Sequence, residues 1–136
     1  MKTKAMIFSM SLLFLFSMLA LPSCKKEKEE VIIPPAYVPV FSATSVTLTG
    51  ADIDFAITCI TDDVEIIKVE VKYPGGLGND IFQGPLQMIK DQPFFFPSPF
   101  PRLSGTWTFI MTGTIRSGTH VGKSFTAQAT VQVSGK

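Results

Sequence analysis

The chain has 136 residues with 12 basic and 11 acidic side chains, which give a formal net charge of +1. A net charge this close to zero provides no electrostatic basis for binding the phosphate backbone of a nucleic acid, so no nucleic-acid partner is expected. The length suits one domain, and the 2 cysteines are too few for a disulfide framework.

The chain begins with the three zones of a secretory signal peptide, predicted over residues 1–23. Lys2 and Lys4 form a basic head, and the stretch from Met6 to Leu21 is apolar apart from its serines. This stretch is shorter than the run of about 18 or more residues that is typical of a membrane-spanning helix, and Pro22 ends it. The pattern therefore predicts export from the cytoplasm.

A cysteine follows this segment directly, in the run Leu21-Pro22-Ser23-Cys24. The run resembles the lipobox of bacterial lipoproteins, in which a leucine and two mostly small residues precede a cysteine. The resemblance implies that the Cys24 thiol receives a diacylglyceryl group, with acyl chains such as palmitate, and that a peptidase cuts before it. Two chains suffice for stable anchoring, because each buried CH₂ contributes about 0.8 kcal/mol. The alternative is a chance cysteine after an apolar run.

Processing at this point changes the charge and the thiol count of the mature chain. Loss of Lys2 and Lys4 leaves 10 basic side chains against 11 acidic ones, a net charge of −1. Lipidation of Cys24 would leave Cys59 without a disulfide partner. Because Cys59 lies in an alternating strand-like run, we expect it to be a buried small hydrophobe rather than a reactive thiol.

Residues 24–36 are interpreted as a tether. The charged run KKEKEE follows Cys24, and Pro34-Pro35 comes shortly after it. Charge and paired prolines favour an extended, solvated chain. The charged run also resembles the surface-export signals of lipoproteins in the Bacteroidota. That resemblance implies an outer-membrane lipoprotein displayed on the cell surface, with a periplasm-facing anchor as the alternative.

Residues 37–136 contain several segments in which apolar and polar side chains alternate with a period of two, the pattern of a strand with one buried face. A short β-branched run covers Ser45–Leu48, and Ile81–Phe82 and Leu86–Ile89 are weaker candidates split by Gly84-Pro85. The side chains predicted to face inward are Ile53, Phe55, Ile57 and Cys59; Ile67, Val69, Val71 and Tyr73; Trp107, Phe109, Met111 and Ile115; and Phe125, Ala127, Ala129, Val131 and Val133.

About seven short strands in roughly 100 residues, with no amphipathic helix after Cys24, predict an all-β fold, a single antiparallel β-sandwich. Glycines in Ser117–Gly122 predict a hairpin between the last two strands. The segment Gly105–Gly113 with the hairpin into Phe125–Val133 resembles the last two strands of immunoglobulin-like and fibronectin-type-III-like domains. The resemblance implies an immunoglobulin-like sandwich, although the paired core cysteines of antibody domains are absent.

The segment Pro93–Pro101 reads PFFFPSPFP. Three adjacent phenylalanines cannot all face one side of a strand, and the prolines oppose regular sheet pairing. The segment is therefore predicted to cross from one sheet to the other with some rings capping the core. The alternative is an exposed aromatic patch that binds a partner or ligand, formed by Phe94, Phe95, Phe96 and Phe100.

Residues suited to metal binding or catalysis are sparse. His120 is the only histidine, and it lies in the predicted hairpin turn, so neither a zinc site nor a catalytic triad is expected. Asp62-Asp63 and Asn79-Asp80 would supply oxygens for calcium if their loops converged, but these residue types also suit turns. We therefore expect no metal, no cofactor and no enzymatic activity.

Anchor, tether and sandwich together favour a membrane-anchored, non-catalytic lipoprotein that acts as a binding or assembly module of the cell envelope. Its partner would be a protein or a glycan. One alternative is a carbohydrate-binding accessory of an outer-membrane uptake system, which would need Trp107 or Tyr73 exposed beside the phenylalanine segment. The other is a small hydrolase, which would need His120 beside a carboxylate and a hydroxyl in a cleft.

Overall fold

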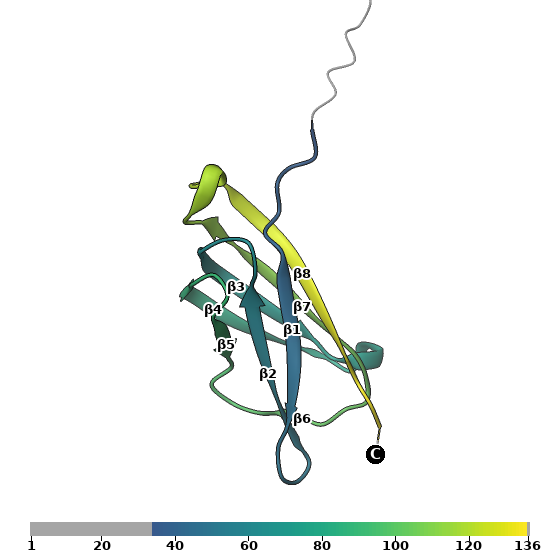
Figure 1. Ribbon diagram of the computed structural model, residues 1–136. Coiled ribbons are helices and arrows are strands. Elements are labelled where there is room, and N and C mark those ends of the chain that lie inside the picture. Colours follow the sequence, from purple (N-terminus) through teal and green to yellow (C-terminus); the bar gives the residue numbers. More distant parts are fainter. Residues whose placement is uncertain (1–33, 136) are drawn as a thin grey trace, which may run out of the picture. The chain divides into compact units, whose positions relative to one another are not determined.

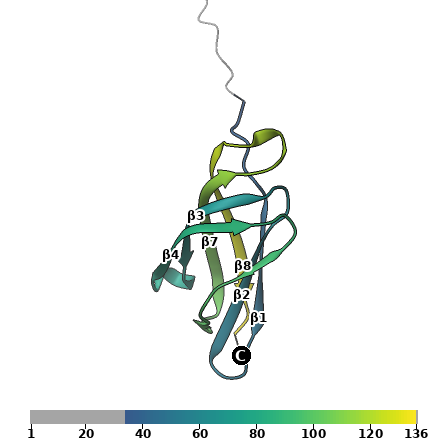
Figure 2. The same ribbon diagram turned by 90° about the vertical axis from the view of Figure 1, so that its left-hand side faces the viewer.

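The computed structural model describes residues 34–135, and one compact unit begins at Pro35. Eight strands form two antiparallel sheets of four strands each (Figures 1 and 2). The only helical elements in the described part of the chain are two three-residue 3₁₀ turns. The predicted all-β sandwich is therefore confirmed, with one strand more than the seven expected.

The first sheet is built around β2 (Asp52–Cys59). On one side β2 pairs with β1 (Phe41–Thr47), which begins earlier than the predicted Ser45–Leu48 run. On its other side β2 pairs with two short strands, β5 (Pro93–Phe95) and β6 (Phe100–Pro101). Both short strands come from the phenylalanine segment, so this edge of the sheet is made of interrupted pieces.

The second sheet has the order β4-β3-β7-β8. A 3₁₀ turn, η1 (Pro74–Gly76), follows β3, and η2 (Gly118–His120) joins β7 to β8 as the predicted hairpin. The strands cover Val64–Lys72 for β3, Asn79–Met88 for β4, Gly105–Ile115 for β7 and Ser124–Val133 for β8.

Strand β4 runs without a break through Gly84-Pro85, so the expected split into two segments was wrong. Pro85 is tolerated because β4 is an edge strand, where one side of the backbone needs no partner. A Cβ atom at position 84 would overlap the carbonyl oxygen of Ile66, so only glycine fits there. The pairing with β3 shifts its register beside this point, between Ile66 and Lys68.

The pairing of β3 with β7 shifts its register at the same point, and the extra residue there lies in β3, which corrects the predicted inward face of this strand. The extra residue of a β-bulge reverses the alternation on one side of it. Ile66 is therefore buried, with 1% of its surface exposed, while Ile67 is 52% exposed. Beyond the bulge Val69 and Val71 are buried as predicted.

The core lies between the sheets and includes the inward residues predicted for β2, β7 and β8, with Val131 only partly buried. The ring of Phe55 lies 4.8 Å from that of Trp107 and 5.1 Å from that of Phe109. The indole nitrogen of Trp107 donates to the carbonyl oxygen of Leu103 at 3.0 Å, which satisfies this buried donor. Cys59 is buried with a free thiol, as predicted.

Candidate functional site

The predicted signal peptide and lipidation motif, with Leu21, Pro22, Ser23 and Cys24, lie outside the described residues. They remain predictions, as does the greater part of the tether. In the part of the chain that the structure describes, no helix is long and apolar enough to cross a membrane.

The phenylalanine segment does not cross between the sheets, which corrects the sequence-based prediction. Both β5 and β6 belong to the sheet of β2, while β4 before them and β7 after them belong to the other sheet. The crossings therefore lie in the short stretches 89–92 and 102–104. Prolines at 93 and 101 fit into paired strands because those strands are at the edge and need only one hydrogen-bonded side.

The four phenylalanines proposed as an exposed patch do not form one. Phe96 is 8% exposed and Phe100 is 3% exposed, and their rings lie 5.3 Å apart in the core. Phe94 is half-buried, and only Phe95 is largely exposed, at 54%. The prediction of an exposed patch was therefore wrong for Phe96 and Phe100, because pairing with β2 turns alternate rings inward.

A small apolar pocket of about 160 Å³ opens between β4 and this segment. Phe82 and Leu86 line one side of it, and Phe94 and Pro97 line the other. It is the gap between the two sheet edges, and the described side chains supply no charged group to orient a ligand in it.

The two aromatic residues named for sugar stacking lie beside Phe100 of this segment, with ring centroids 5.7 Å away for Trp107 and 6.5 Å away for Tyr73. Trp107 is fully buried. Tyr73 is half-buried, and its hydroxyl donates to a carboxylate oxygen of Asp80 at 2.5 Å. That hydrogen bond, with burial and the charge of Asp80, raises the pKa of Tyr73 to about 12. Tyr73 thus holds the start of β4 in place.

His120 is half-buried in its turn. Its ring stacks on that of Tyr37, with the centroids 3.9 Å apart and the planes at 12°. The Tyr37 hydroxyl donates to Asp62 at 2.7 Å, and Asp62 is only 4% exposed. The imidazole Nδ1 is buried without a partner. A stacked imidazole cannot accept a proton from the hydroxyl of the ring below it, so these three residues lack the geometry of a catalytic triad.

The four residues considered for calcium lie at opposite ends of one strand. Asp62 and Asp63 precede β3, whereas Asn79 pairs with Lys72 at its far end. Nine strand residues separate the two places by roughly 25 Å. Among the described residues no group of three or more metal-binding side chains comes together. The aspartates shape turns instead: the Asp63 carboxylate, for example, accepts the amide of Lys90 at 2.8 Å.

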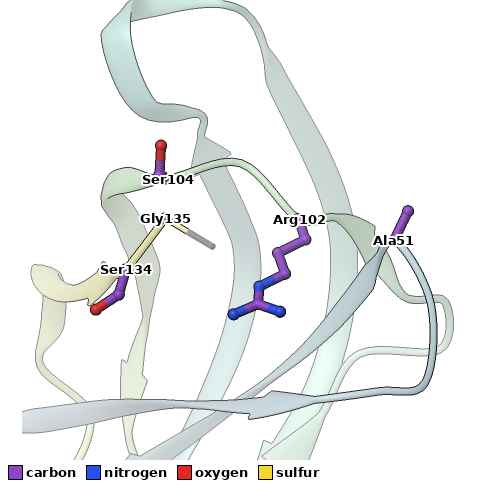
Figure 3. A pocket seen from close by; sticks show the side chains of 5 residues that line it. All are labelled: Ala51, Arg102, Ser104, Ser134 and Gly135. Carbon is purple, nitrogen blue, oxygen red and sulfur yellow. The ribbon is translucent and has the colours of Figure 1, made fainter.

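A larger pocket of about 320 Å³ contains a guanidinium group that sequence reasoning missed (Figure 3). Its lining residues are Ala51, Arg102, Ser104, Ser134 and Gly135. Arg102 follows β6, and its side chain extends into the space between Ala51 and Gly135 (Figure 3). No motif surrounds Arg102 in the sequence, and the lining residues come from three distant parts of the chain, so no local signal could have found it.

The Arg102 pocket lies at the end of the domain opposite to Tyr37. Tyr37 contacts the η2 turn, from which β8 runs the length of the sheet to Ser134 and Gly135 (Figure 1). Strand β1 starts near Tyr37 and runs in the same direction as β8. Ala51 lies in the loop that follows β1. The chain thus enters the domain at one end and forms the pocket at the other.

No family model, no curated protein and no solved structure matches this chain. The function is therefore inferred from the residues of this chain alone.

Proposed function

We propose that the protein is a lipid-anchored, non-catalytic module of the bacterial cell envelope that presents a β-sandwich domain to a binding partner. The observation that carries the proposal is Cys24, placed directly after Leu21-Pro22-Ser23 at the end of a short apolar run with a basic head. A diacylglyceryl group on that thiol would hold the protein on the outer membrane without a spanning helix.

The architecture of the domain agrees with presentation from a tether. The segment 24–36 is charged and rich in proline, as expected of a spacer that lifts a domain off a surface. The sandwich has its own core, formed by both sheets. The chain enters the domain at the Tyr37 end, so the Arg102 pocket lies at the end of the domain opposite to the point where the tether joins it.

We propose a non-catalytic module because of the position of His120. It is the only histidine of the chain, and its ring is stacked on Tyr37 instead of hydrogen bonded to a nucleophile. Asp62 is already bound by the Tyr37 hydroxyl. This arrangement favours a structural role that fastens the segment 34–40 to the sandwich, and it disfavours the small hydrolase.

The anchor is tested by the substitution Cys24→Ala in the full-length chain expressed in a Gram-negative bacterium. The wild-type protein should fractionate with membranes and enter the detergent phase, and mass spectrometry should find a diacylglyceryl adduct on a chain that starts at Cys24. The variant should keep residues 1–23 or become soluble. Cys59→Ala is the matched control, since it removes the other cysteine, and it should partition like the wild type.

Unchanged membrane partition and unchanged mass in the Cys24→Ala protein would refute the lipid anchor. Digestion of intact cells with an added protease then separates the two orientations. Loss of the domain would place it on the cell surface, whereas full protection would place it in the periplasm.

A further inference from the structure

The Arg102 side chain is half-buried and has no anionic partner among the described residues. Its Nε atom is buried and makes no hydrogen bond. The one ion pair among residues 34–135 joins Arg116 to Glu65 at 2.7 Å, at another place on the second sheet. A guanidinium carries a permanent charge, so its burial is costly unless an anion or hydrogen-bond acceptors compensate it.

The surroundings of Arg102 are shaped to admit such an acceptor. The pocket has a volume of about 320 Å³, at the lower end of the range of about 300–1,000 Å³ typical of small-molecule sites. Its other described lining residues are small or hydroxyl-bearing, and none of them is acidic. Figure 3 shows the guanidinium between Ala51 and Gly135, with the hydroxyl groups of Ser104 and Ser134 directed away from it.

We propose that this pocket binds the carboxylate group of a small ligand, with the Arg102 guanidinium as its principal contact. The inference deepens the proposed function and rests on it for the statement that the domain is a binding module. A guanidinium offers parallel N–H donors that match the two oxygens of a carboxylate.

Charge favours a carboxylate over a phosphate group. Among the described residues, Arg102 is the only cationic side chain that lines the pocket. One guanidinium neutralises the single charge of a carboxylate, whereas a phosphate monoester carries a charge of about −1.5 to −2 and would remain partly uncompensated.

The test is isothermal titration of the full-length protein, purified in detergent, with two carboxylates and their neutral counterparts. Glucuronate is compared with glucose, and N-acetylglycine with N-acetylglycinamide, so that an acidic sugar and an amino-acid derivative are distinguished as sources of the carboxylate. We expect at least one carboxylate to bind at least about tenfold more tightly than its neutral counterpart, because hydrogen bonds to charged groups are the strong ones.

The variant Arg102→Gln should weaken that binding by about tenfold or more. Arg102→Lys keeps the charge but loses the parallel N–H donors, so it should bind the carboxylate with intermediate affinity. This variant replaces Arg102→Gln in the test if the glutamine variant does not fold. Arg116→Gln is the matched control, because it removes a guanidinium outside the pocket, and it should bind like the wild type.

Several results would overturn the inference. Equal binding of the charged and neutral ligands would do so, as would no binding of either carboxylate, or wild-type affinity in both Arg102 variants. Tighter binding of inorganic phosphate than of either carboxylate would overturn the choice of ligand. Because these titrations need no lipid, a failed carboxylate site and a failed Cys24 anchor give separate outcomes.

Discussion

Phe95 and Phe96 are neighbours in the chain, yet the first ring is 54% exposed and the second only 8%. The difference comes from the pairing of Phe95 with Ala56 in β2, which fixes the backbone so that successive side chains point to opposite faces. Phe100 is placed in the same way by its pairing with Ile53, and its ring lies 5.5 Å from that of Phe55. A residue's role in this segment is thus decided by its partner on β2 and not by its type.

This difference predicts opposite effects of two alanine substitutions. Phe100→Ala should lower the free energy of unfolding by about 3–5 kcal/mol, because it leaves a cavity among aromatic rings. Phe95→Ala should lower it by less than about 1 kcal/mol, because its ring is largely in water already. Urea denaturation followed by tryptophan fluorescence measures both, since Trp107 is buried beside Phe100. Similar losses in the two variants would contradict the assigned burial.

At the scale of elements, the pairing of β4 with β3 depends on a glycine on the exposed edge of the sheet. Gly84 lies beside the register shift between Ile66 and Lys68. A side chain at Gly84 would meet the backbone of Ile66, which cannot move without breaking its pairing with Gly113 in β7. An exposed position is therefore intolerant of even a methyl group.

We expect Gly84→Ala to destabilise the domain by about 2 kcal/mol or more, since the overlap involves backbone rather than a flexible side chain. Gln83→Ala, at an exposed neighbouring position in the same strand, is the control and should change stability by about 0.5 kcal/mol or less. Hydrogen exchange of the β3 and β4 amides should accelerate in the glycine variant alone. Wild-type stability in Gly84→Ala would contradict the close approach of the two strands.

For the whole molecule, the reactivity of the two cysteine thiols tests both the folding of the domain and the lipidation of the chain. Cys59 is fully buried between the sheets, whereas Cys24 lies in the segment that is predicted to carry the lipid. A thiol in the core is shielded from reagents until the domain unfolds, and a thioether-linked lipid leaves no thiol at all.

The protein purified from membranes should therefore show no reactive thiol under native conditions and one per chain in denaturant, counted with a chromogenic thiol reagent. The Cys24→Ala chain should give the same counts, because only Cys59 remains. A rapidly reacting thiol in the native wild-type protein would show that Cys24 is free, and two thiols in denaturant would confirm it.

Features that depend only on residues adjacent in the chain could be predicted from the sequence. Alternation in β2, β7 and β8 identified their inward faces, because each strand buries one face and the period of two is local. The proposed anchor is local in the same sense, since Leu21 to Cys24 forms a contiguous motif. The all-β class followed from these strands and from the absence of an amphipathic helix.

The tertiary structure alone decided the features that join distant segments. The bulge that exposes Ile67 and the strands formed by the phenylalanine segment depend on what each backbone pairs with, which the period does not encode. The stacking of His120 on Tyr37 and the pocket at Arg102 likewise unite residues far apart in the chain. The sequence by itself therefore determined the alternating strands β2, β7 and β8 and the predicted cellular location, whereas the place available for a ligand was decided by the packing of the sheets.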